Sequence, residues 1–128
     1  MSRSPRRLLL SAVAVVAAAT TGILFTPGAA LADIGYVYTD NGAGSAYFQS
    51  YGEHLYACDE AADGLRAIAQ LNVNGHIYEV QDADGANGNC WTINLSITEG
   101  TLVTLRACLR NGASGALQHC SGWRQGTA

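Results

Sequence analysis

The sequence predicts an all-β fold, in which seven or eight short antiparallel strands form a β-sandwich with two disulfides, preceded by an N-terminal signal helix. Three observations favour this fold. Beyond residue 32, apolar residues alternate with the period of two that is typical of strands. Clusters of Asn, Asp and Gly separate these runs at near-regular spacing, and four cysteines form an even set in a short chain.

Residues 1–32 are typical of a cleavable secretory signal peptide. Arginines at positions 3, 6 and 7 precede an apolar stretch over residues 8–25, and Ala30-Leu31-Ala32 supplies the small side chains that a signal peptidase requires before Asp33. A transmembrane anchor is the alternative, but Pro27-Gly28 interrupts the apolar stretch. We therefore expect a secreted, extracellular protein without membrane attachment after cleavage. The arginine pair leaves the twin-arginine route open beside the general one.

The domain expected after cleavage, residues 33–128, is acidic. It keeps all ten acidic residues but only four of the seven arginines, and the chain has no lysine, so the formal charge falls from −3 to −6. Nucleic acids and anionic membrane surfaces attract proteins with a basic surface. The charge therefore disfavours both as partners.

The four cysteines, Cys58, Cys90, Cys108 and Cys120, predict two disulfides. A zinc site is the alternative, but the three histidines are isolated and no Cys-x-x-Cys pair occurs. Three connectivities are possible. We favour Cys58 with Cys90 and Cys108 with Cys120, because the second pair brackets a turn. We expect no metal and no cofactor.

Residues 65–73 place Leu65, Ala67, Ala69, Leu71 and Val73 on one face of a strand. Asn-Gly follows at positions 74 and 75, and this pair tolerates the positive φ values of a two-residue hairpin turn. Residues 76–81 are therefore predicted to return as the partner strand. A helix over residues 60–71 is the alternative, although Asp-Gly at positions 63 and 64 interrupts it.

The remaining predicted strands are residues 34–39, 45–51, 54–58, 91–97, 101–109 and 116–121. This number of short strands, with turn signals between them, predicts a sandwich of immunoglobulin-like general shape. A small barrel is the alternative. The sequence has no internal repeat and no low-complexity linker, so we expect a single domain.

Two acidic loops raise the question of a metal site. Residues 82–89 are rich in oxygen ligands, but the spacing fails the helix-flanked calcium pattern because Ile93 stands where that pattern needs Glu. Asn, Asp and Gly also favour turns for conformational reasons. We therefore interpret this loop, and the acidic turn at residues 59–64, as ordinary connections.

No motif predicts catalytic residues. The nearest approach to a nucleophile elbow, residues 42–46, lacks the required pattern. A glycosidase needs two carboxylates on either side of a sugar cleft, and Glu53, Glu79 and Glu99 can be combined without any preference. The protein is therefore predicted not to be an enzyme.

Aromatic side chains are the best candidates for a binding surface. Tyr36 and Tyr38 share one face of a predicted strand, and Tyr47 and Tyr51 share a face of the next. Such rings could stack on sugars or fill a partner's pocket, whereas packing within a core is the alternative. The candidate binding residues are Tyr36, Tyr38, Tyr51 and Trp123.

The segment Gly-Glu-His-Leu-Tyr-Ala-Cys-Asp at residues 52–59, followed by Ala-Asp-Gly at 62–64, carries a resemblance. It resembles small secreted proteins of actinomycete bacteria, of uncharacterised function, in which Gly-Glu/Asp-x-x-x-x-Cys-Asp precedes Ala-Asp-Gly. The resemblance implies a secreted β-sandwich with disulfides and implies no activity.

Two classes of function follow. The first is a secreted, non-catalytic binding or inhibitory module that acts on an extracellular protein or polysaccharide. The second is a small secreted hydrolase without a recognisable motif.

Overall fold

The computed structural model describes residues 32–128 of the chain. The predicted signal peptide and its helix lie outside these residues, apart from Ala32. Within the described part there is no helix, so the helix considered for residues 60–71 is wrong and a strand begins at Arg66 instead. Accordingly, residues 32–128 contain no helix long and apolar enough to cross a membrane.

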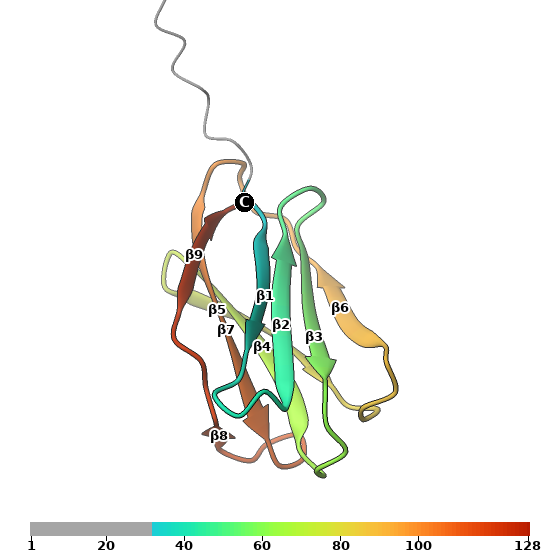
Figure 1. Ribbon diagram of the computed structural model, residues 1–128. Coiled ribbons are helices and arrows are strands. Elements are labelled where there is room, and N and C mark those ends of the chain that lie inside the picture. The colour runs from blue at the N-terminus through green and yellow to red at the C-terminus, as the bar shows by residue number, and fades with distance from the viewer. Residues whose placement is uncertain (1–31) are drawn as a thin grey trace, which may run out of the picture.

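Two antiparallel sheets pack face to face (Figure 1), which confirms the predicted all-β sandwich. The four-stranded sheet has the order β1-β2-β3-β6 and contains β1 (Ile34–Tyr38), β2 (Gly44–Gln49), β3 (His54–Asp59) and β6 (Cys90–Asn94). The five-stranded sheet has the order β5-β4-β7-β8, with β9 also paired to β7. Its strands are β4 (Arg66–Val73), β5 (His76–Asp82), β7 (Leu102–Arg110), β8 (Leu117–Gln118) and β9 (Arg124–Thr127).

Each of the eight expected strand segments overlaps a strand, and the ends agree within one residue except in β2, β6 and β8. β8 covers only Leu117–Gln118 of the expected residues 116–121. β2 ends at Gln49 rather than at Tyr51, because the chain turns over Ser50–Glu53 with positive φ at Gly52 and Glu53. β6 ends at Asn94, three residues before the expected end.

A ninth strand, β9, was not expected. It lies against β1 closely enough that a Cβ added at Gly126 would come within 2.4 Å of Ile34 Cγ1. Only glycine allows this approach.

The predicted hairpin is confirmed. Asn74 and Gly75 have φ values of 52° and 87° between β4 and β5, as a type I′ turn requires. The turn sets the register in which Ala69 lies opposite Val80 and Leu71 lies opposite Tyr78. These residues thereby face the other sheet.

The core lies between the two sheets and is made of alternate residues from every long strand. Its largest fully buried side chains include Phe48, Leu55, Leu71, Leu105 and Leu109. Full burial of each such side chain contributes about 1.5–3 kcal/mol relative to its exposure. The core therefore fixes which face of each strand points outward.

Both favoured disulfides are present. Cys58–Cys90 joins directly paired residues of β3 and β6, and Cys108–Cys120 joins β7 to the segment after β8. Two disulfides in a domain of this size are typical of extracellular proteins.

Candidate binding surface

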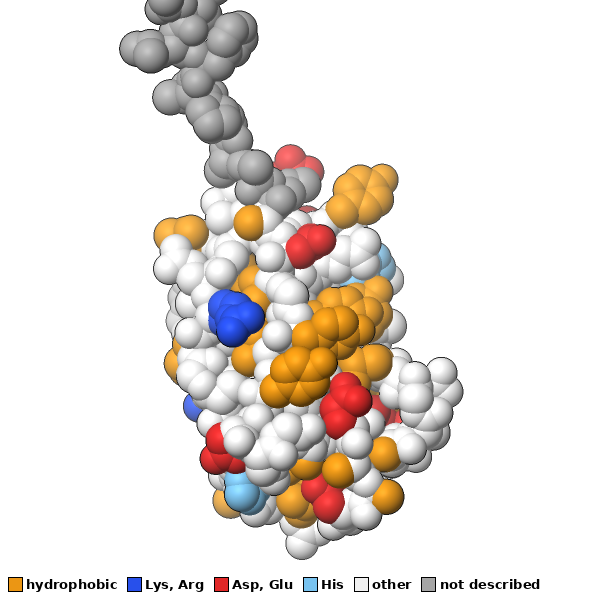
Figure 2. Space-filling view, viewed as in Figure 1, with side chains coloured by type: hydrophobic (Ala, Val, Ile, Leu, Met, Phe, Trp, Pro, Cys, Tyr) orange, Lys and Arg blue, Asp and Glu red, His pale blue; other side chains and the backbone are white. Residues whose placement is uncertain are grey.

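The outer face of the four-stranded sheet carries a row of aromatic rings, here called the tyrosine face. It consists of Tyr36 and Tyr38 on β1, Tyr47 on β2, and His54 and Tyr56 on β3. Figure 2 shows the hydrophobic side chains gathered over β1, β2 and β3.

The strand registers place these rings outward. Tyr47 lies directly opposite Tyr56, while their neighbours Phe48 and Leu55 pair on the buried side. Since side chains alternate across a strand, burial of one set exposes the other.

A bulge in β1 brings its two tyrosines onto this face. Ile34 pairs with Phe48 and Val37 pairs with Ala46, so three steps along β1 match two along β2. The extra residue lets both Ile34 and Val37 enter the core, at 1% and 5% exposure. Without the bulge, Ile34 would share a face with Tyr36.

The rings form a continuous chain of contacts. Centroid distances are 6.2 Å for Tyr38–Tyr36, 4.7 Å for Tyr36–Tyr47, 4.0 Å for Tyr47–Tyr56 and 6.2 Å for Tyr56–His54. The central pair is stacked with an interplanar angle of 8°. Aromatic pairs of this kind contribute about 0.5–1.5 kcal/mol beyond burial, so the rings hold one another in place.

Neighbouring side chains oppose ionisation of the central phenol and hold the His54 end of the row in place. Burial, followed by the neighbouring Tyr56 and Tyr36 rings, raises the pKa of Tyr47 to about 12, so its phenol resists ionisation even in alkali. At the β6 end, His54 Nδ1 lies 2.5 Å from Asn94 Oδ1. The face is therefore uncharged at its centre and anchored at its edge.

Two shallow hollows flank Tyr36. One, of about 300 Å³, lies between the β1 tyrosines and the loop at residues 83–89 before Cys90, here called the disulfide loop. It is lined by Tyr36, Tyr38, Cys58, Asp59, Glu60, Gly88, Asn89 and Cys90. The other, of about 260 Å³, is lined by Asp33, Ile34, Gly35, Tyr36, Tyr47, Phe48 and Gln49. The tyrosine face thus has relief that a partner could fill.

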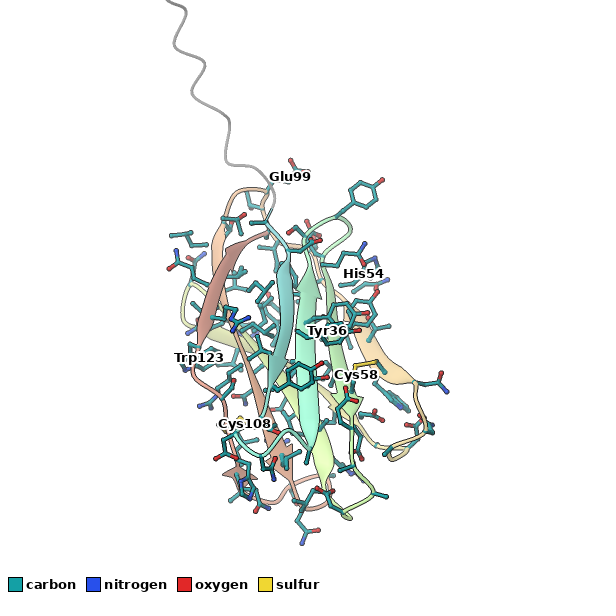
Figure 3. All side chains as sticks on the ribbon, viewed as in Figure 1. Tyr36, His54, Cys58, Glu99, Cys108 and Trp123 are labelled. Atoms are coloured by element: carbon teal, nitrogen blue, oxygen red, sulfur yellow. A yellow bond between two sulfur atoms is a disulfide. The ribbon has the colours of Figure 1, made fainter. Side chains whose placement is uncertain are left out.

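The structure unites only two of the four candidate binding residues. Tyr36 and Tyr38 are 52% and 54% exposed and contact each other. Tyr51, 81% exposed, lies in the turn after β2 rather than on the strand face expected with Tyr47. Trp123, 43% exposed, lies 4.6 Å from the guanidinium carbon of Arg106 and beside β9, away from Tyr36 (Figure 3).

Sequence reasoning missed Tyr56, His54 and Glu60 as parts of this surface. The alternation of residues 54–57 places His54 and Tyr56 on one face, which is a usable signal. Their pairing with Tyr47 depends on the register set by the turn at residues 50–53, and the sequence prediction assigns the first two residues of this turn, Ser50 and Tyr51, to the strand before it.

The outer face of the five-stranded sheet is different, because a polar network covers it. Glu79 accepts hydrogen bonds from Arg110 at 2.5 and 3.2 Å and from the Gln70 amide at 2.8 Å. Gln70 in turn accepts from Arg106 Nε at 2.9 Å. Burial alone would raise the pKa of Glu79, but the hydrogen bonds from Arg110 and Gln70 outweigh it and lower the pKa.

The two acidic loops meet at one end of the sandwich, around a hollow of about 520 Å³ lined in part by Asp59 and Asp82. The buried Asp82 accepts a hydrogen bond from the Asp59 backbone N–H at 2.9 Å and so links the two sheets. Burial, together with a hydrogen bond that the protonated Asp82 carboxyl donates to the Asp84 carboxylate, raises the pKa of Asp82, and the same bond lowers the pKa of Asp84. Within residues 32–128, no group of three or more Asp, Glu, His or Cys side chains is arranged to hold a metal ion.

The serine of the near-elbow and the three histidines each contact another side chain. Ser45, of the near-elbow at residues 42–46, is buried and donates to Glu60 Oε1 at 2.7 Å. Among the histidines, His54 bonds Asn94, His119 bonds Asp40 and His76 contacts the Tyr78 ring.

No family model, curated protein or solved structure matches the chain.

Proposed function

We propose that the chain is a secreted, non-catalytic binding module that recognises an extracellular protein through the tyrosine face. The observation that carries the proposal is the continuous row of rings across β1, β2 and β3, with Tyr36 and Tyr38 more than half exposed. The predicted signal peptide and the two disulfides support action outside the cell.

Tyrosine suits this role for a physical reason. It offers a large contact area with only two side-chain torsions, so little conformational entropy is lost on binding. Here the rings also pack on one another, above hydrogen-bonded strands that a disulfide joins at Cys58. A rigid surface loses less free energy on binding than a mobile one.

Ring orientation supports a protein partner over a polysaccharide. Sugars stack on open ring faces, but at the centre of the row Tyr47 and Tyr56 cover each other at 4.0 Å. Of the rings in the row, only Tyr36 and Tyr38 keep more than half of their surface exposed. Mutually stacked rings present edges and hydroxyl groups, which suit the mixed apolar and polar surface of a protein. The formal charge of −6 disfavours nucleic acid and anionic membranes.

The test is capture by the immobilised, oxidised protein from the medium of the producing culture, followed by quantitative binding of the purified partner. Replacing Tyr36 and Tyr38 together by Ala should weaken binding at least tenfold, because both are more than half exposed and so offer the contact area of the face. Tyr51→Ala is the matched control, since Tyr51 is exposed but lies outside the face. It should leave binding unchanged.

Three results would contradict the proposal. Equal losses in the Tyr51→Ala protein and in the double variant would remove the face from the interaction. Retention on insoluble polysaccharide, with no protein partner, would replace the partner class. Hydrolysis in a broad substrate screen, lost on changing Asp82, would favour an enzyme instead.

A further inference from the structure

The hollow between the β1 tyrosines and the disulfide loop has the features of a receptor for a single side chain. Tyr36 and Tyr38 form one wall, Gly88 and Asn89 line it from the loop before β6, and Glu60 lies where β3 ends. Its volume of about 300 Å³ is at the lower limit for small-molecule pockets. It therefore fits one long side chain better than a whole ligand.

Glu60 is held in position for a cation. Its backbone N–H donates to the Ala43 carbonyl at 3.0 Å, and its Oε1 accepts from the Ser45 hydroxyl at 2.7 Å. The residue is nevertheless exposed, and within residues 32–128 only its Oε1, and not its Oε2, accepts a hydrogen bond. A carboxylate oxygen is thus presented beside two exposed rings.

Within residues 32–128, no arginine lines this hollow. Arg66, Arg106 and Arg110 lie by register on the outer face of the other sheet, where Gln81, Gln70 and Glu79 accept their hydrogen bonds. Figure 2 shows acidic side chains at both ends of the orange patch and one basic side chain beside it. With a formal charge of −6 and no lysine, residues 33–128 are complementary to a cationic partner.

We propose that this hollow receives an arginine side chain of the protein partner, stacked on Tyr36 and Tyr38 and paired with Glu60. The inference rests on the proposed function and names the chemistry of its contact. Arginine is preferred to lysine because its planar guanidinium stacks on aromatic rings and bonds a carboxylate with parallel N–H groups. The same protein already places Arg106 over Trp123 at 4.6 Å.

The test needs no identified partner. N-acetyl-arginine-methylamide is titrated into the oxidised protein with labelled tyrosine rings, and NMR shifts of Tyr36 and Tyr38 are followed. We expect saturable shifts with millimolar affinity. The citrulline analogue, which has nearly the same shape but no charge, should bind at least tenfold more weakly.

Variants locate the contact. Glu60→Gln should weaken the arginine probe at least fivefold, whereas Glu99→Gln, which removes an exposed carboxylate from the turn before β7, should not. Equal binding of arginine and citrulline, or equal losses in the two variants, would overturn the inference. If partner capture needs Tyr36 and Tyr38 but the arginine probe does not bind there, the inference fails while the proposed function stands.

Discussion

The outer faces of the two sheets satisfy their side chains in different ways. On the five-stranded sheet, Glu79, Gln70, Arg106 and Arg110 bond one another, so most of their donors and acceptors are met within the protein, although within residues 32–128 the buried Arg110 Nε has no hydrogen-bond partner. On the four-stranded sheet, the rings contact one another but leave Tyr36 and Tyr38 largely exposed. A face that satisfies its own polar groups gains little from a partner, whereas exposed rings gain from being covered.

The largest expected effect comes from the disulfides, one of which belongs to each sheet. Replacing Cys58 and Cys90 by Ala should lower the free energy of unfolding by about 4 kcal/mol, and replacing Cys108 and Cys120 by about 3 kcal/mol. The reason is loop length, because the sequence separations are 32 and 12 residues. Urea denaturation of both double variants measures the order, and a reversed order would refute this reason.

The next largest effect comes from replacing one carboxylate at each sheet, Glu79 or Glu60, by an amide. Glu79→Gln should lower the free energy of unfolding at pH 7 by about 2 kcal/mol, because Arg110, with its side chain only 13% exposed, loses its charged partner. Glu60→Gln removes an exposed carboxylate and should cost less than about 1 kcal/mol. Similar costs in urea denaturation would show that the network is no more stabilising than the surface of the other sheet.

The network should also make stability depend on acid. The pKa of Glu79 is lowered in the folded protein, so its contribution is present above the unfolded value of about 4.3 and is lost as the pH falls through the lower folded value. The midpoint temperature of thermal unfolding should therefore fall less steeply between pH 6 and pH 2 in Glu79→Gln than in the unsubstituted protein. Parallel profiles for the two proteins would contradict this assignment.

The tyrosine face should respond to alkali instead. The pKa of Tyr47 is raised to about 12, so the folded state resists its ionisation, and stability falls as the pH rises from the unfolded value of about 10 towards 12. Ultraviolet titration of tyrosinate should show one late-ionising group that Tyr47→Phe removes. If the group that disappears in Tyr47→Phe instead titrates near 10, the pKa of Tyr47 is not raised by its surroundings.

The parts of the fold that sequence predicted are those governed by local chemistry. Asn74-Gly75 adopts the positive φ values that its residue types allow, and alternation over residues 65–73 identified β4. The cysteine pairing was also correct, since a turn between Cys108 and Cys120 brings them together. β9 was missed because Arg-Gln-Gly-Thr has no apolar alternation, and its place depends on β7 and Ile34.

The sequence by itself indicated eight of the nine strands in residues 32–128 and favoured the observed cysteine pairs, because these follow from periodicity, turn residues and spacing. Only the tertiary structure decided which aromatic residues form a surface. The bulge in β1 and the turn at residues 50–53 set registers that place Tyr47 between Tyr36 and Tyr56 and leave Tyr51 outside the face. The pairing of β9 with β7 places Trp123 elsewhere. A register depends on which side chains the two sheets can bury together, and that is a property of the whole core.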